Sequence, residues 1–499
     1  MSQYPILLII APLLSAFLIT IAGWFGRKIH SIFGAAALAV SCFCSIQLLR
    51  DVISHGPLSY RLGGWAPPIG IEYYIDHLSA LILVLVSSIA LLNFIATRTM
   101  VEGEYGERTP VFYALYLLAV TGHLGIVVTG DAFNLYVLLE ISALSGYALL
   151  AMGNERAPFS SLRYLLMGTV GASFYLLGVG YLYIMTGSLN MLDLAALLPG
   201  LYNSMAVMAA FGLIMIGLWI KMAFFPLHTW LPNSYSDAFA AASSLIAPMT
   251  TKVMIYVMMR MMLTVFTPQF SLGMQKLSST VVWLAVVAMV MGAFFSLSQR
   301  DLRRMLSYII VSEVGYMVGG AWLGNRMGMT GSILHIVNDA LMTFCVFLAV
   351  AAIASQKGTL HFDGLKGIFR KMPFTMGAFV VGGLSMIGVP PTCGFFSKWY
   401  LILGGIEAGH YGFVCALVAS SLINVVLFFR VFEIAYFEPF SGHAGNGDAH
   451  GHKTEPLQEA NWDLLAVLLG VTIGLFVVGL LTGEIVGRVV EPAIPAQIM

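Results

Sequence analysis

Long apolar runs separated by short polar stretches fill this 499-residue chain. Most runs hold about 20 residues, the length at which a helix crosses a hydrocarbon core of roughly 30 Å. The pattern therefore predicts an all-α polytopic membrane protein, a single membrane domain over 1–499 with about 14 transmembrane helices. The predicted spans are 4–23, 31–49, 76–97, 110–129, 132–152, 161–186, 204–226, 239–265, 278–298, 304–323, 330–355, 374–402, 409–436 and 462–483.

Composition agrees with this pattern. Hydrophobic residues make up 59% of the chain and charged residues 10%, whereas soluble domains carry about 25% charged residues. The mean hydropathy is +0.89. These values exclude a soluble globular protein.

Basic residues divide unequally between the two sides of the predicted spans. With the N-terminus outside, 15 Lys and Arg lie on the inward side and 6 on the outward side. Short loops rich in Lys and Arg remain in the cytoplasm. We therefore expect a multi-pass protein of the cell inner (plasma) membrane with both termini outside.

Three lysines depart from this distribution. Lys221, Lys252 and Lys398 lie inside long apolar runs, whereas the other Lys and Arg lie in loops or near the ends of runs. A charge at the middle of a membrane helix costs roughly 3 kcal/mol on insertion scales. Since an apolar residue would avoid that cost, the three lysines indicate a function.

Further titratable residues share these runs and suit proton transfer. Burial lowers the pKa of a lysine and a nearby carboxylate raises it, so a Glu–Lys pair can hold and release a proton. Histidine titrates in the physiological range, and His335 and Asp339 are spaced i, i+4 on one predicted helix. The predicted relay residues are Glu140, Lys221, Lys252, Glu313, His335, Asp339 and Lys398.

Three polar residues in or near these runs also have a purely structural explanation. Glu313 follows Arg303 and Arg304 and would then lie close to the cytoplasmic surface. Asp339 would be an interhelical hydrogen-bonding group, and His228 a structural cap. The deep positions of Glu140, Lys221 and Lys252 favour the functional interpretation.

Glu140 and Lys221 are predicted to form an ion pair between two helices. Their segments run in opposite directions, and at 1.5 Å per residue both side chains fall in the same half of the membrane. Each charge alone would be expensive there, while a pair lowers the cost of both.

Prolines stand beside all three buried lysines. Proline cannot donate a hydrogen bond to the carbonyl four residues earlier, so it breaks or kinks a helix. Pro226, Pro248 and Pro390-Pro391 therefore predict three broken helices, which a bilayer tolerates where they face protein or a wet cavity. Simple kinking is the alternative.

A weak internal sequence repeat predicts two structurally similar units. Glu140 precedes Lys221 by 81 residues, and Glu313 precedes Lys398 by 85. Each unit, 110–265 and 278–436, would hold five spans, and an odd number makes the second unit begin on the opposite side of the membrane. Such inverted repeats place functional sites at broken helices near the midplane in many transporters.

No cofactor and no metal are predicted. The five cysteines lie in apolar segments without CxxC spacing, which is typical of small core residues. No glycine-rich nucleotide loop follows a strand. A polar stretch with three histidines, 441–452, is better explained as a solvated loop than as a metal site.

Four motifs, in the order in which they occur, resemble the antiporter-like subunits shared by respiratory complex I, membrane-bound hydrogenases and Mrp-type cation/proton antiporters. They are Asp131-Ala-Phe-Asn-Leu-Tyr-Val-Leu-Leu-Glu140, Lys221-Met-Ala-Phe-Phe-Pro-Leu-His-Thr-Trp-Leu-Pro232, Gln299-Arg-Asp-Leu-Arg-Arg-Met-Leu-Ser-Tyr308 and Gly388-Val-Pro-Pro-Thr-Cys-Gly-Phe-Phe-Ser-Lys398. The resemblance implies 14 helices with two inverted five-helix units. It also implies proton-relay roles for Glu140, Lys221, Lys252, His335 and Lys398. Thr343 stands where the family often has a lysine, so either a relay site is missing or water bridges it.

Two segments resemble the D-type member of Mrp antiporters and its hydrogenase relatives, Phe133-Asn134-Leu135 and Ser234-Tyr235-Ser236. We therefore expect a Na⁺(K⁺)/H⁺ antiporter subunit that works with other integral membrane subunits and has no nucleic-acid partner. The alternative is a proton-pumping membrane-arm subunit of a hydrogenase or NADH:quinone oxidoreductase, because the same helices serve both. An inert scaffold is a third option, which the buried lysines disfavour.

Overall fold

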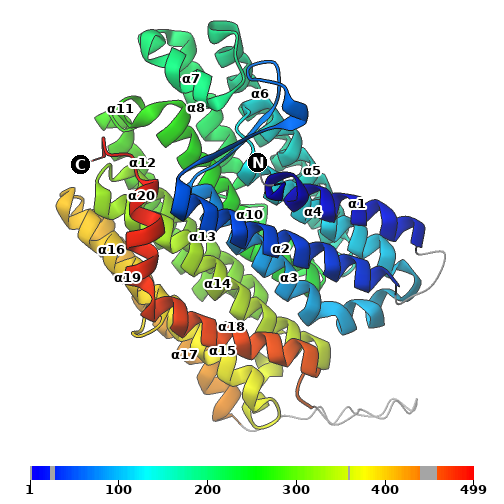
Figure 1. The fold of residues 1–499 in the computed structure, drawn as a ribbon. Coiled ribbons are helices and arrows are strands. Elements are labelled where there is room, and N and C mark those ends of the chain that lie inside the picture. The colour runs from blue at the N-terminus through cyan, green and yellow to red at the C-terminus, as the bar shows by residue number, and fades with distance from the viewer. Residues whose placement is uncertain (1–2, 23–28, 358–359, 439–457, 499) are drawn as a thin grey trace.

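The computed structural model describes residues 3–22, 29–357, 360–438 and 458–498. In Figure 1 the long helices lie side by side as a bundle, and the short helices α7 and α11 lie at one end of it. An antiparallel hairpin of β1 (Leu58–Arg61) and β2 (Glu72–Ile75) is the one sheet within the described residues. The stretch 441–452, with its three histidines, lies outside them.

The long helices agree with the predicted spans, each of which contains at least one helix. These helices are α1 (Tyr4–Ala22), α2 (Ile29–His55), α3 (His77–Tyr105), α4 (Thr109–Val128), α5 (Ala132–Ala151), α6 (Ala157–Thr186), α8 (Met205–Lys221), α10 (Ala240–Arg260), α12 (Gln275–Leu297), α13 (Leu302–Trp322), α14 (Arg326–Lys357), α15 (Pro373–Ile387), α16 (Cys393–Glu407), α17 (Tyr411–Tyr436) and α18 (Trp462–Leu480). The helical membrane architecture is thus confirmed. By length and composition, ten helical stretches of the described chain can cross a membrane, so the count of 14 and the inverted repeat stay predictions.

Short elements connect these helices. The α-helical ones are α7 (Met191–Leu197), α9 (Leu231–Asp237), α11 (Thr267–Ser271), α19 (Thr482–Ile485) and α20 (Glu491–Ala493). The 3₁₀ turns are η1 (Leu62–Gly64), η2 (Gly106–Arg108), η3 (Leu198–Leu201), η5 (Phe362–Leu365) and η6 (Ile368–Arg370). Two π-helical turns are η4 (Met261–Val265) and η7 (Val486–Val490).

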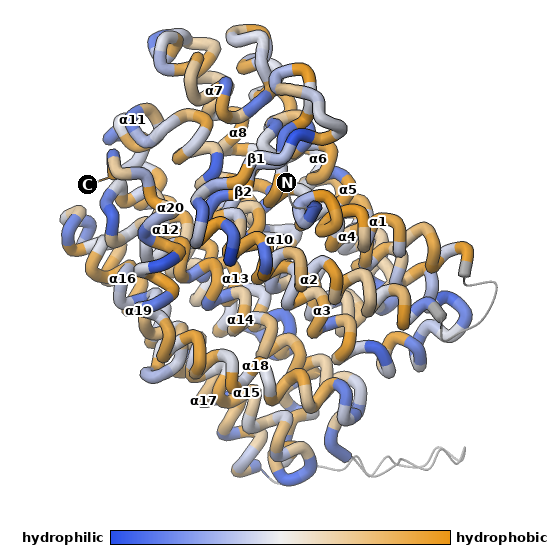
Figure 2. The backbone as a smooth tube through the Cα atoms, viewed as in Figure 1, coloured by the Kyte–Doolittle hydropathy of each residue, from blue (hydrophilic) through white to orange (hydrophobic). Residues whose placement is uncertain are grey.

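Hydrophobic residues cover the middle parts of the helices, and hydrophilic residues gather in the connections (Figure 2). The peripheral helices expose large apolar side chains, among them Phe17 on α1 and Phe294 on α12. By contrast, α10 is buried along its whole length and α14 along nearly all of it. Helices apolar on their outer face suit a lipid solvent, and the buried pair α10 and α14 forms the centre of the protein.

Two helices are broken as predicted. α8 ends at Lys221 and helical structure resumes with α9, while α15 and α16 are separated by residues 388–392. The predicted break at Pro248 is wrong, because α10 continues through this residue. A proline removes a single helical hydrogen bond, and protein packed around all sides of α10 keeps the helix continuous.

Aspartates start the helices that carry two of the predicted carboxylates. Asp131 accepts a hydrogen bond from the backbone N–H of Asn134 at 2.7 Å at the start of α5, which holds Glu140. Asp301 does the same for Arg304 at 3.0 Å at the start of α13, which holds Glu313. Such N-caps stabilise a helix by about 1 kcal/mol.

Candidate functional site

The seven predicted residues come together in three clusters, and all of them except the partly exposed Glu140 are buried. They lie on six helices, α5, α8, α10, α13, α14 and α16. The first cluster joins Glu140 to Lys221, the second joins Lys252 to Asp339, and the third joins Glu313 to His335 and Lys398.

In the first cluster, Lys221 Nζ lies 3.6 Å from Glu140 Oε1, which confirms the predicted ion pair. The ammonium also donates a hydrogen bond to the hydroxyl of Tyr147 at 3.3 Å. Lys221 is the last residue of α8, where the negative end of the helix dipole favours a cation. The break after Lys221 therefore helps to keep a charge inside the membrane.

The second cluster is almost completely shielded from solvent. Lys252 Nζ and Asp339 Oδ2 are 2.8 Å apart, and their side chains are 1% and 0% exposed. Thr343 donates its hydroxyl proton to Asp339 Oδ1 at 3.1 Å and lies 3.5 Å from Lys252 Nζ. The residue that departs from the family pattern thus contacts both members of this pair.

The third cluster is centred on Glu313. One carboxylate oxygen lies 2.6 Å from His335 Nε2 and the other 3.8 Å from Lys398 Nζ. Glu313 is fully buried, midway along α13, which argues against a position at the cytoplasmic surface.

The break between α15 and α16 also contributes to this cluster. Lys398 donates to the carbonyl of Met386 at 2.6 Å, and Pro390 leaves that carbonyl without its usual helical donor. Ser397 lies 2.8 Å from His335 Nδ1. The broken helix thus supplies an acceptor for the buried ammonium, as we expected of helices that line a cavity.

α14 connects the second and third clusters. Its residues His335 and Asp339 are one turn apart, a rise of about 6 Å. They do not act on a common partner, however, because His335 contacts Glu313 and Asp339 contacts Lys252. Neighbouring Asn338 donates instead to the carbonyl of Cys393 at 2.7 Å.

Several contacts were missed by the sequence reasoning. Tyr147 and Ser397 carry no charge at neutral pH, so a search for charged residues passes over them. His123 is buried in the middle of an apolar run, and its position in that run is a signal that the sequence analysis used for His335 but not for His123. His228 stacks on Phe225, with ring centroids 5.0 Å apart, a packing role.

Arg260 is one of the six basic residues that the sequence analysis counted on the outward side, and the structure buries it at the end of α10. Its guanidinium binds both carboxylate oxygens of Asp76, at 2.6 and 2.9 Å. Bidentate pairs of this kind are geometrically specific, and this one joins α10 to the start of α3.

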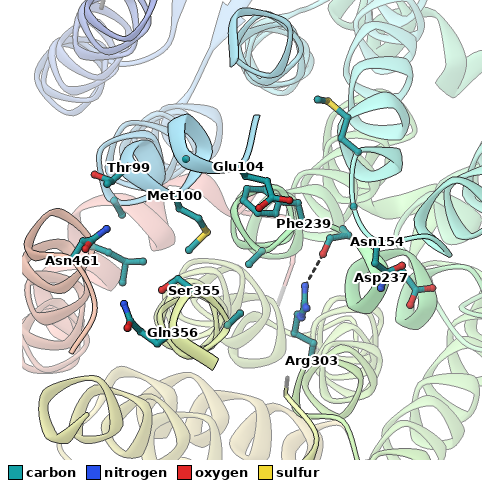
Figure 3. A pocket seen from close by; sticks show the side chains of 18 residues that line it. Thr99, Met100, Glu104, Asn154, Asp237, Phe239, Arg303, Ser355, Gln356 and Asn461 are labelled. Carbon is teal, nitrogen blue, oxygen red and sulfur yellow. Dashed lines mark hydrogen bonds between the residues drawn. The ribbon is translucent and has the colours of Figure 1, made fainter. Parts of the chain in front are cut away.

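A polar cavity of about 460 Å³ lies at the end of the bundle where α10 begins (Figure 3). Glu104, Asp237 and Arg303 line it, together with the ends of α3, α14 and α18. Arg303 donates to the carbonyl of Ala238 at 2.6 Å, the bond drawn as a dashed line. The cavity thus adjoins the start of α10. Lys252 lies about 18 Å further along this helix, at a rise of 1.5 Å per residue.

Comparison with known proteins supports one family. Residues 129–424 match the family described as "NADH:quinone oxidoreductase/Mrp antiporter, TM". NADH-quinone oxidoreductase subunit N of Desulforudis audaxviator is 42% identical, with 99% of each chain covered. The D-type subunit of the Na(+)/H(+) antiporter of Bacillus subtilis is 29% identical, with 88% of this chain and 87% of the relative covered.

Solved structures share the fold. A chain of the membrane-bound sulfane sulfur reductase, an archaeal respiratory membrane complex, superposes with a TM-score of 0.89 at 28% identity, covering 98% of this chain and 97% of the other. A chain of the Mrp complex from Dietzia sp. DQ12-45-1b gives 0.87 at 23% identity, covering 99% and 97%. The chain belongs to the NADH:quinone oxidoreductase/Mrp antiporter transmembrane family, as its motifs indicated.

Proposed function

We propose that this protein translocates protons along its three buried clusters, as one membrane subunit of a larger complex. The observation that carries the proposal is the ion pair between Glu140 of α5 and Lys221 of α8, backed by two further carboxylate–cation clusters. Ionisable residues within a membrane are expensive and mark ion and proton pathways. Paired lysines and carboxylates can exchange a proton when the pair opens and closes.

The position of Glu140 supports a partner subunit. Its side chain is 25% exposed, and it shares the outer face of α5 with the exposed apolar residues Phe133 and Leu144. A carboxylate partly open to lipid would be costly. A neighbouring membrane subunit that covers this face would remove that cost.

Lys398 lies near a second outer face. It lines a cavity of about 250 Å³ with Trp399 and Leu422, and both of these residues are exposed apolar side chains. The relay thus reaches towards the surface of the bundle at two separate places, which suits a subunit placed between neighbours.

We also propose that both termini lie outside and that the polar cavity beside Arg303 opens to the cytoplasm. The unequal distribution of Lys and Arg supports this orientation. Glu104 and Asp237 would then give water and protons a polar path to the start of α10.

Two assemblies accommodate such a subunit. A Mrp-type antiporter, in which the proton gradient drives Na⁺ or K⁺ export, is the first, in keeping with the resemblance to the D-type antiporter proteins. The membrane arm of a redox complex is the second, and the 42% identity to an NADH-quinone oxidoreductase subunit N supports it. Purification through a tag on this chain distinguishes them: co-purifying small antiporter subunits support the first and iron–sulfur subunits the second.

The relay itself is tested by substitution in the purified complex, reconstituted in vesicles with a pH-sensitive dye. Lys221→Ala and Glu140→Gln should abolish coupled proton movement while the subunits remain assembled, and Glu140→Asp should have a milder effect. Glu102→Gln is the matched control, because Glu102 forms an exposed pair with Arg98. Wild-type proton movement in assembled Lys221→Ala would refute the proposed function.

A further inference from the structure

One buried titratable residue takes no part in the three clusters. His123 lies on α4 and is 2% exposed. Its Nδ1 is 2.7 Å from the carbonyl oxygen of Ala119, and its Nε2 is 3.2 Å from Thr250 Oγ1. Thr250 belongs to α10, the helix that also carries Lys252. His123 therefore touches the helix of the second cluster.

The first of these contacts determines the tautomer. A carbonyl oxygen only accepts, so Nδ1 must carry the hydrogen that lies between it and Ala119. In the neutral ring, Nε2 then has a free lone pair and accepts from the Thr250 hydroxyl. The imidazole is thus arranged to take up a proton at Nε2, the atom that faces away from its own helix turn.

His123 also shares a cavity with Lys221. This cavity holds about 10 Å³ and is lined by His123, Lys221, Ser142 and Thr250 among others. Its volume is at the lower limit for one water, and it offers the polar partners that a buried water needs.

The backbone keeps this cavity in place. α4 and α5 meet at Gly122, where an added Cβ would lie 2.5 Å from the backbone nitrogen of Ser142. Only a glycine permits this approach, which holds His123 and Ser142 at the same small space. The two residues thus belong to a preformed site.

We propose that His123 exchanges protons with Lys221 of the first cluster, through one water in this cavity, while it is hydrogen-bonded to Thr250 of α10. This inference rests on the proposed function and adds a residue to it. The Lys221 ammonium gives a proton to the water, and the water passes one of its own to His123 Nε2. Lys221 becomes a neutral amine, His123 becomes an imidazolium, and the water is regenerated.

Thr250 on α10 stabilises the protonated ring. The protonated Nε2 donates to Thr250 Oγ1, whose hydroxyl can turn from donor to acceptor. The neutral ring is restored when Nε2 gives its proton back to the water and the water passes one of its own to the Lys221 amine. His123 in this way adds a protonatable group to the first cluster.

The test uses the assembled complex in vesicles and compares matched variants. His123→Gln keeps a polar amide but cannot be protonated, and proton movement should fall on the order of 10²-fold, as for loss of a general acid–base group. His30→Gln is the control, because His30 is another buried histidine and packs against Tyr113 of α4. This control variant should retain the wild-type rate of proton movement. Thr250→Ser should retain transport, and Thr250→Val should lower it.

Chemical rescue separates proton transfer from packing. His123→Ala should be slow, and imidazole added to the vesicles should restore proton movement, since it supplies the missing base. Wild-type rates in His123→Gln, or an assembled His123→Ala that imidazole does not restore, would overturn the inference. The proposed function survives that result as long as Lys221→Ala is inactive, so the two failures are distinguishable.

Discussion

Removing Asp339 should destabilise the protein more than removing any exposed charge. In Asp339→Leu, the Lys252 ammonium would remain buried without a counter-charge. At 2.8 Å and an effective dielectric constant of about 20, the lost attraction is about 6 kcal/mol. Measured losses on breaking buried pairs are about 3–5 kcal/mol, because the remaining charge relaxes, and we expect a value in this range.

A second substitution provides the decisive comparison. Lys252→Met together with Asp339→Leu removes both charges and fills the space with apolar atoms, which is often neutral or stabilising for buried pairs. The double variant should therefore be more stable than either single variant, yet inactive in proton transport. Stability is measured by thermal unfolding of the purified complex, and transport in vesicles.

The control is the exposed pair of Arg98 and Glu102, whose side chains are 44% and 37% exposed. Glu102→Gln should change stability by less than about 1 kcal/mol. If Asp339→Leu were as mild as Glu102→Gln, or if the double variant were less stable than both single variants, the view of this pair as a desolvated charge pair would be refuted.

Two other predictions address the first cluster and the orientation. Gly168→Ala on α6 would place a Cβ against the Tyr147 hydroxyl, so it should displace this hydrogen-bond partner of Lys221 and lower the transport rate. Gly180→Ala is the control, because an added Cβ there has no heavy atom within 4 Å, and it should leave the transport rate unchanged. Equal rates in both variants would contradict this role of Tyr147. A C-terminal alkaline phosphatase fusion should be active and a green fluorescent protein fusion dark, because the C-terminus is proposed to lie outside; the opposite pattern would reverse the orientation of the whole relay.

The sequence alone determined the membrane class, the position of the long helices and the identity of the charged residues. A helix in lipid must be apolar for about 20 residues, so each span can be recognised from its own residues without knowing which helices pack beside it. For the same reason a lysine inside a span is easily recognised. Lys221, Lys252 and Lys398 were found in this way, and the motifs around them pointed to the correct family.

The Glu140–Lys221 pair was predicted from the sequence, but only the tertiary structure decided the partners of the other buried charges. Lys252 and Thr343 are 91 residues apart in the chain, and no periodicity in a single sequence predicts that α10 and α14 are neighbours. The continuity of α10 through Pro248 likewise depends on the protein packed around it, whereas a proline by itself favours a break. His123 gained a role only through Thr250 and Lys221, which lie on other helices. Most of the helices are thus decided within a segment, whereas the continuity of α10 and the pairing of most buried charges depend on packing between segments.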